Sequence, residues 1–412
     1  MLNDNKEREL AYIVTIDEIR PIEGYDRVEY ARTNGWWVIV KKDQFKVGNL
    51  AVYIEVDSKV PSDNPAFDFL EKRDYKVKTQ KMCKVISQGL LMSLEDFPDI
   101  FEEDHVSNMG WVYKGVKCEY NIVEPGQFLT KLLKITYSVA EDNKRKGKGP
   151  DKYEKMAARH QKLFRKNKMI KWLYKRLWGK KLLFLFLGKK KDKRGWPAWV
   201  TKTDEERCQN LPQLFPGDST KWIVTEKIDG TSTTFTIKRK SFNKYDFYVC
   251  SRNVCFDTPE KAEKCFYDTN VYLEMAYKYN VETVLKEILF DYDKLEFVTL
   301  QGETYGEGVQ KRNYSIKDRD FVAFNLIYGF KDGKKERLNT RDMKIILDKY
   351  KIPSVPILDT ITLPETCEEL LTYAEGNSVL DGKMREGIVL RTEDGVNSFK
   401  AVSNEYLLKY HQ

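Results

Sequence analysis

The sequence predicts an α+β protein built from three consecutive parts. These are a small N-terminal β-barrel at residues 1–138, a basic helical insert at 139–200 and an antiparallel-sheet domain at 201–412. Period-2 runs dominate the first part, Lys and Arg are concentrated in the second, and strand-like runs alternate with helical ones in the third. A chain of 412 residues is about three times the usual domain length, which allows each folded part its own core.

The N-terminal part contains four β-rich runs separated by turn residues, at 11–19, 35–42, 50–56 and 82–94. Such runs are typical of a small antiparallel barrel or sandwich. A five-stranded OB-type barrel is one economical arrangement, and it commonly carries nucleic acid. Any other small β domain fits the pattern equally well.

The insert carries the positive charge of the chain. Between residues 144 and 194 there are 21 Lys and Arg against three acidic residues, a segment charge of +18; because the whole chain carries +8, the remainder carries −10. The run at 152–178 has helical spacing, with one apolar face formed by Met156, Leu163, Ile170, Leu173 and Leu177. The chain is therefore an acidic protein with one basic amphipathic insert.

The insert allows four interpretations. Its charge suits an RNA backbone, an anionic lipid surface contacted through 169–194 or an import signal; alternatively, the helix packs on its own protein. The six apolar residues at 182–187 cannot cross a bilayer. The chain also has seven cysteines, an odd number. The short apolar run and the odd cysteine count together predict an intracellular protein with reduced thiols, in the cytoplasm or the nucleus.

In the third part, strand-like runs occur at 221–227, 231–240, 246–252, 297–303, 320–328 and 386–392, with a helical run at 259–279. The most informative motif is Glu226-Lys227-Ile228-Asp229-Gly230, between two of these strands. It is followed in order by Ser251-Arg252-Asn253, Gly302-Glu303, Glu386-Gly387 and Lys400. A short motif alone is weak evidence, whereas this ordered set is specific.

The ordered set resembles the covalent nucleotidyltransferases, and within them the RNA ligases that repair nicks, typified by the second RNA ligase of phage T4. The segment 302–311 followed by Asn313-Tyr314 favours RNA ligases over DNA ligases. A barrel placed before the catalytic domain is similar to the ligases of the Deinococcus and Naegleria type. The resemblance implies an OB domain and an ATP-grasp-like adenylation domain, and it leaves the insert unmatched.

The resemblance also implies roles for individual residues. Lys227 would be the nucleophile that takes AMP from ATP, and such a lysine is expected to have a lowered pKa. Glu303 and Glu386 would hold Mg²⁺ or Mn²⁺, which bind carboxylate oxygens. The remaining nucleotide-binding residues would be Arg207, Glu226, Gly230, Arg252, Phe324 and Lys400. Phe324 would stack on adenine; without the resemblance it is an ordinary core residue of a strand, and each cation is a surface charge.

One position departs from the family. T4-type ligases end their last motif with Lys, any residue, Lys, whereas here Lys400 and Ala401 are followed by Val402. Lys409 or a residue of the insert could supply the missing charge.

The sequence thus predicts a monomeric ATP-dependent RNA ligase that seals 3′-OH/5′-phosphate breaks, nicks in duplex RNA above all, through lysyl-AMP and RNA-adenylate. Its partners would be RNA and end-healing enzymes. The alternatives are a DNA ligase, a capping guanylyltransferase, or a catalytically decayed protein that binds RNA or a membrane.

Overall fold

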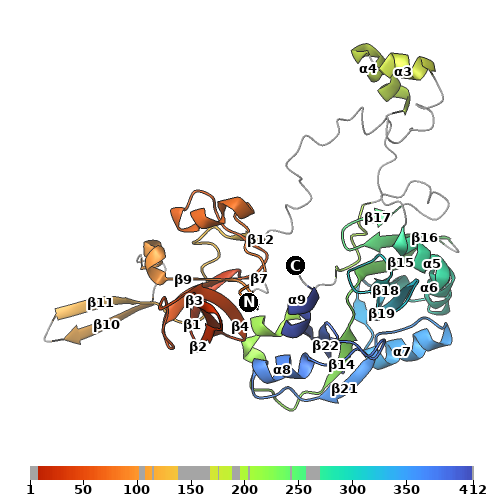
Figure 1. Ribbon diagram of the computed structural model, residues 1–412. Coiled ribbons are helices and arrows are strands. Elements are labelled where there is room, and N and C mark those ends of the chain that lie inside the picture. The colour runs from red at the N-terminus through yellow and green to blue at the C-terminus, as the bar shows by residue number, and fades with distance from the viewer. Residues whose placement is uncertain are drawn as a thin grey trace.

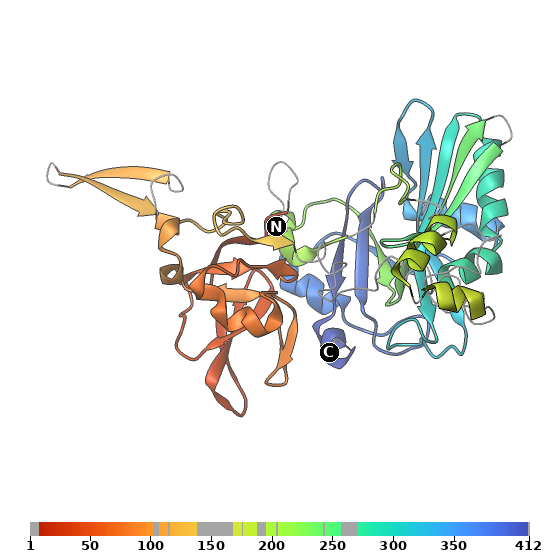
Figure 2. The same cartoon turned by 90° about the horizontal axis from the view of Figure 1, so that it is seen from above.

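The computed structural model describes residues 8–101, 107–113, 116–137, 168–174, 176–187, 195–202, 205–241, 244–256 and 270–410. Two folded bodies lie side by side, one formed by the N-terminal strands and one by the C-terminal half (Figures 1 and 2). This arrangement matches the predicted order of a β domain followed by an α+β domain.

The N-terminal body is an OB-fold domain made of two three-stranded sheets. One contains β1 (Ala11–Thr15), β5 (Leu50–Ile54) and β9 (Leu90–Met92); the other contains β2 (Glu18–Ile22), β3 (Tyr25–Thr33) and β4 (Trp36–Lys41). Backbone hydrogen bonds such as Gln88 N to Trp37 O at 2.8 Å join the two sheets. The alternating apolar residues of these strands fill two buried clusters, one of them centred on Tyr12, Trp36 and Tyr53.

The predicted strand at 82–94 is three short strands instead of one. These are β7 (Gln80–Met82), β8 (Val85–Ser87) and β9, and the breaks fall where the backbone has positive φ. Cys83 and Lys84 form the first turn and Gly89 the second. The remaining strands here are β6 (Ser58–Lys59), β12 (Thr136–Tyr137) and the hairpin β10 (Ser107–Tyr113) and β11 (Val116–Ile122), which projects from the domain (Figure 1).

The C-terminal domain consists of two sheets. The five-stranded sheet contains, in order, β13 (Glu206–Arg207), β23 (Ser398–Val402), β22 (Gly387–Thr392), β14 (Trp222–Lys227) and β21 (Ile357–Ile361). The six-stranded sheet contains β17 (Cys255–Phe256), β16 (Lys244–Ser251), β15 (Thr231–Ser241), β18 (Leu295–Gly306), β19 (Arg319–Phe330) and β20 (Lys335–Arg337). All six strand-like runs predicted for this half are strands.

Helices cover both sheets. The apolar faces of α5 (Val271–Lys278), α6 (Val281–Asp291) and α7 (Thr340–Lys349) enter the main core with the six-stranded sheet, and α8 (Cys367–Ala374) packs on the five-stranded one. Asn270 caps α5 by accepting hydrogen bonds from two backbone amides. Part of the helical run predicted at 259–279 lies outside the described residues.

The OB-fold domain contacts the C-terminal domain directly. Ile86 of β8, Val402 of β23 and Leu407 of α9 (Asn404–Tyr410) form one buried apolar cluster. Polar contacts flank it: Lys81 Nζ donates to Leu408 O at 2.8 Å, and Arg32 forms an ion pair with Glu368. The strand and helix that end the chain are therefore held against the barrel.

The insert is less regular than its spacing predicts. The predicted helix at 152–178 lies partly outside the described residues, which include α3 (Lys168–Tyr174) and α4 (Leu177–Leu187). Ile170 and Leu173 are on α3, whereas Leu177 begins α4, so the single helical stripe is broken. Within the described part of the chain, no helix is long and apolar enough to cross a membrane.

Candidate active site

The segment 227–230 connects the two sheets of the C-terminal domain. Lys227 is the last residue of β14 in the five-stranded sheet, and Thr231 begins β15 in the six-stranded sheet. The motif lysine therefore lies where the chain crosses from one sheet to the other. This is the position between two strands that the sequence predicted.

Two carboxylates from distant segments lie beside the lysine. Lys227 pairs with Gly387 in the register of β14 and β22, which brings Glu386 next to it, and Lys227 Nζ lies 2.7 Å from Glu386 Oε2. Glu303 lies on β18, where it pairs with Ser232 of β15. Ser232 is two residues after Gly230, so Glu303 is held close to the lysine segment. Strand pairing thus assembles Lys227, Glu303 and Glu386 from three separate segments.

Gly230 is required by the approach of β18. A Cβ at this position would lie 2.3 Å from the carbonyl oxygen of Thr304 and 2.9 Å from Cγ of Glu303. Real Cβ contacts are essentially never that short, so any larger residue would displace the strand that carries Glu303. The sequence analysis placed Gly230 among the nucleotide-binding residues; the structure shows that it also allows a close approach of the protein's own backbone.

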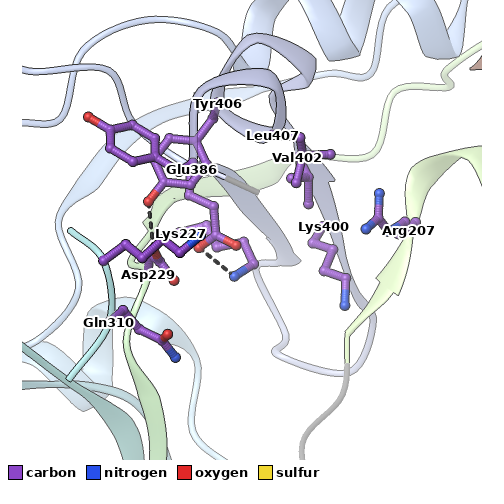
Figure 3. A pocket seen from close by; sticks show the side chains of 11 residues that line it. Arg207, Lys227, Asp229, Gln310, Glu386, Lys400, Val402, Tyr406 and Leu407 are labelled. Carbon is purple, nitrogen blue, oxygen red and sulfur yellow. Dashed lines mark hydrogen bonds and ion pairs between the residues drawn. The ribbon is translucent and has the colours of Figure 1, made fainter. Parts of the chain in front are cut away.

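A pocket of about 360 Å³ opens over the lysine (Figure 3). Its lining includes Arg207 and Lys400, which are register partners in the parallel pair β13 and β23. Cations separated by almost the whole domain in sequence are thus neighbours on one wall. The complete lining consists of Arg207, Lys227, Asp229, Gln310, Lys311, Glu386, Lys400, Val402, Tyr406, Leu407 and Tyr410.

Two tyrosines hold Asp229. The hydroxyl of Tyr406, on α9, donates a hydrogen bond to Asp229 Oδ2 at 2.6 Å, and the hydroxyl of Tyr314 accepts one from the Asp229 amide at the same distance. Figure 3 shows Tyr406 reaching from α9 toward Asp229. The segment that carries the lysine is therefore fixed from both sides.

The charges around the lysine act against one another. Burial by itself would lower the pKa of Lys227, but the nearby charges of Glu386 and Glu303 outweigh it and raise that pKa above its ordinary value. Burial raises the pKa of Glu303 to about 8, with Lys227 opposing the rise and Glu386 adding to it. In the protein by itself the two carboxylates stabilise the ammonium, so the expected lowering of the lysine pKa depends on added positive charge such as a bound metal ion.

The donor set fits a hard divalent cation that keeps much of its water. Among the described residues, no three His, Cys, Asp or Glu side chains converge as a metal-binding group. Glu303 and Glu386 nevertheless provide two carboxylates that are close enough for the charge of Glu386 to raise the pKa of Glu303. Mg²⁺ is usually bound through one or two carboxylates, with water and substrate phosphates completing its coordination. Glu303, with its raised pKa, is a carboxylate whose charge such an ion would stabilise.

Sequence comparison agrees with this geometry. The sequence model of the RNA ligase family matches residues 220–411, and a model of an OB-fold domain matches residues 10–94. The C-terminal domain thus matches the RNA ligase family over most of its length. No curated protein sequence matches the chain closely enough to count as a relative.

Solved structures of Naegleria gruberi RNA ligase are similar to this chain over almost its whole length. A variant bound to AMP and manganese has 26% identity and a TM-score of 0.64, with 98% of this chain and 99% of that chain covered. A form with pyrophosphate has 26% identity and a TM-score of 0.63, with 98% of this chain and 99% of that chain covered. A variant with ATP and manganese has 26% identity and a TM-score of 0.64, with 98% of this chain and 100% of that chain covered. The similarity includes both domains.

Five of the predicted site residues are not part of the lining of this pocket, namely Glu226, Gly230, Arg252, Glu303 and Phe324. Glu226 is buried on β14 and accepts a hydrogen bond from the amide of Val379 at 2.9 Å. Arg252 is exposed after β16, and its charge acts on Glu303. Phe324 is half-buried on β19 and packs against a cluster that contains Ile228. Their roles toward a nucleotide stay predictions.

The departure at Val402 has a structural reason. Val402 is 4% exposed and packs against the OB-fold domain, where a lysine would bury its charge. Lys409 is exposed on α9 and is not part of the pocket lining, whereas Lys311 is. Among the described residues, Lys311 is therefore better placed than Lys409 to supply a further positive charge.

The polar lining residues that sequence reasoning did not select include Asp229, Gln310, Lys311 and Tyr406. Signals for three of them were present: Asp229 belongs to the lysine motif, and Gln310-Lys311 ends the segment used to recognise the family. Tyr406 had no such signal, since an aromatic residue on a short terminal helix is ordinarily a core residue.

Proposed function

We propose that this ligase uses ATP to seal breaks with a 3′-hydroxyl and a 5′-phosphate, and that its preferred substrate is a nick in duplex RNA. The observation that carries this proposal is the pairing of Lys227 with Glu386 at 2.7 Å in a pocket that also contains Arg207 and Lys400. A lysine with carboxylates on one side and cations on the other is suited to reaction with a triphosphate, because the carboxylates can hold a metal ion and the cations can bind phosphate. The structures of the Naegleria ligase with ATP, AMP and pyrophosphate support the same substrate.

The chemistry proceeds in three transfers. The neutral amine of Lys227 attacks the α-phosphorus of ATP, so a P–N bond forms and the bond to the leaving pyrophosphate breaks. AMP then passes from the lysine to the 5′-phosphate of RNA, which restores the lysine. Finally the 3′-hydroxyl attacks the activated phosphate and AMP leaves, which makes the phosphodiester bond.

The residues of the pocket divide this work by charge. Lys227 must lose a proton before it attacks, and Glu386 is a hydrogen-bond acceptor within reach at 2.7 Å. A divalent cation held at Glu303 and Glu386 would neutralise phosphate charge and offset the stabilisation of the ammonium. Arg207 and Lys400 bind the phosphates by charge-assisted hydrogen bonds, Phe324 stacks on adenine, and Arg252 binds the ribose or a phosphate.

The OB-fold domain would grip the RNA strand beyond the break. It is docked next to the pocket through Val402 and Leu407, so a strand crossing the pocket would continue onto the barrel. The reaction consumes 3′-hydroxyl and 5′-phosphate ends, whereas many cleavage reactions leave other termini. An end-healing enzyme that restores these ends is therefore the class of partner that supplies the substrate.

A labelling experiment tests the first transfer. The protein is incubated with α-labelled ATP or GTP and Mg²⁺ and then separated under denaturing conditions. We expect covalent label from ATP, its loss in Lys227→Ala and its retention in Lys349→Ala, which changes an exposed lysine of α7. No label from either nucleotide would refute the proposal, and label from GTP alone would indicate a capping enzyme.

The second test separates the nucleic-acid substrates. Nicked RNA duplex, nicked DNA duplex and single-stranded RNA with the same ends are supplied at equal concentration. We expect the fastest sealing for nicked RNA. Faster sealing of nicked DNA would make the protein a DNA ligase, and label transfer without sealing of any substrate would contradict the assigned reaction.

A further inference from the structure

The described part of the insert is a compact helical hairpin. In Figure 1, α3 and α4 stand apart from both domains. The two helices meet at Gly179, where a Cβ would lie 2.0 Å from the carbonyl oxygen of Leu173. Backbone hydrogen bonds from Arg176 N to Leu173 O and from Lys180 N to Arg176 O close the turn, at 3.1 and 2.8 Å. The glycine thus allows α4 to fold back on the end of α3.

Large apolar side chains of this hairpin remain in solvent. Met169 is 66% exposed, Trp172 49%, Trp178 53% and Leu182 43%. The two tryptophan rings contact each other edge to face, with centroids 6.3 Å apart. Leu182 also begins the run of six apolar residues that ends α4. Exposed apolar side chains gathered on so small an element mark a surface made for contact.

Positive charge accompanies these apolar side chains. Residues 168–187 contain six Lys and Arg and no acidic residue. The guanidinium of Arg176 lies 3.9 Å from the centre of the Trp172 ring, and the ammonium of Lys180 lies 5.0 Å from that of Tyr174. Cations and interfacial aromatics therefore occupy the same surface, whereas the chain outside residues 144–194 is acidic.

We propose that the α3–α4 hairpin binds the surface of a bilayer that contains anionic lipid. Tryptophan rings and adjacent lysines are the residues that settle at the boundary between headgroups and acyl chains. The eleven residues of α4 span only about 16 Å, against a hydrocarbon core of about 30 Å, so the hairpin lies in the interface and does not cross it. The hairpin would hold the ligase at a membrane.

RNA fits this surface less well than lipid does. Phosphates would occupy the cations and bases could stack on the tryptophans, but Met169 and Leu182 would gain nothing from a polar strand. Packing on the protein itself would cover these side chains, yet they are exposed. A lipid surface offers negative headgroups to the cations and hydrocarbon to the exposed apolar side chains.

Vesicle sedimentation with the full chain tests this proposal. We compare phosphatidylcholine vesicles with and without phosphatidylserine. Wild type is expected to bind the anionic vesicles, and Trp172→Ala/Trp178→Ala is expected to lose about tenfold or more in partitioning. Lys180→Gln/Lys181→Gln should weaken binding to anionic vesicles in a salt-sensitive manner. The matched control is Tyr277→Ala, which removes an aromatic ring that is 58% exposed on α5.

The outcomes separate this inference from the ligase assignment. Retained ATP labelling in every variant shows that the domains stay folded, because the hairpin contributes nothing to the pocket lining. Failure of wild type to bind anionic vesicles overturns the inference, as does equal loss in Tyr277→Ala. If the tryptophan variant instead loses affinity for duplex RNA and keeps its vesicle binding, the surface serves RNA and the membrane proposal is wrong.

Discussion

The hydroxyl of Tyr406 lies 2.6 Å from Oδ2 of Asp229, across a sequence separation of 177 residues. Asp229 belongs to the segment that carries Lys227, and Tyr406 belongs to the last helix of the chain. Burial and the charge of Glu386 raise the pKa of this aspartate, while the hydrogen bond from Tyr406 lowers it. The helix that carries Tyr406 is therefore part of the candidate active site, because it helps to set the position and the charge of a residue two positions from Lys227.

Replacing Tyr406 with phenylalanine is predicted to slow adenylylation. The change removes the hydroxyl but keeps the ring, and a hydrogen bond to a charged group is worth about 1.5–3 kcal/mol, so the rate should fall by about tenfold to a hundredfold. Single-turnover labelling measures it. Tyr410→Phe is the control, since that ring contacts Tyr406 in a tilted arrangement with centroids 4.5 Å apart. An unchanged rate in Tyr406→Phe would show that the bond has no catalytic importance.

Gly230→Ala is predicted to destabilise the domain by about 1–3 kcal/mol and to abolish most labelling. The added methyl group would lie 2.3 Å from Thr304 O, so β18 and Glu303 must move. Thermal unfolding and ATP labelling report the two effects separately. Gly195→Ala is a matched control, because a Cβ there meets no heavy atom within 4 Å. If both variants behave alike, the close approach of β18 does not constrain this site.

Val402→Lys introduces the residue type that T4-type ligases have at this position, and we predict that it harms this protein. The ammonium would enter the apolar contact with Ile86 and Leu407, at a cost of about 3 kcal/mol or more. Thermal unfolding should show a lower melting temperature, and ligation should be weakened as the barrel loses its docking. Val396→Lys, at a side chain that is 70% exposed, should leave stability unchanged. A gain of activity in Val402→Lys would contradict this explanation.

Lys311→Ala is predicted to raise the KM for ATP by about fivefold with a smaller effect on kcat. Its side chain lines the pocket, where an exposed cation attracts phosphate without a fixed geometry. Initial rates of adenylylation at several ATP and salt concentrations measure the effect, which should shrink as salt rises. Lys317→Ala removes an exposed lysine of the same loop region outside the lining and should not change KM. An equal effect in both variants would indicate general charge attraction.

Much of the C-terminal fold follows from local pattern. The runs that became β14, β15, β18 and β19 have strand-forming composition, and strands of this length are recognised from alternation and turn residues. The break between β7 and β8 was missed because it depends on positive φ at Cys83 and Lys84. Neither residue type signals a turn, so tertiary contacts determine it.

By itself, the sequence determined the order of the two folded parts, the lysine motif and the basic insert, because each depends on residues that are close together in the chain. Only the tertiary structure brought Lys400 beside Arg207 and Glu386 beside Lys227, through strand pairing across long separations. The tertiary structure also determined the direction in which the pKa of Lys227 shifts and the reason why Val402 is apolar. Burial and neighbouring charge control both, and these are properties of the assembled sheets and their contact with the barrel.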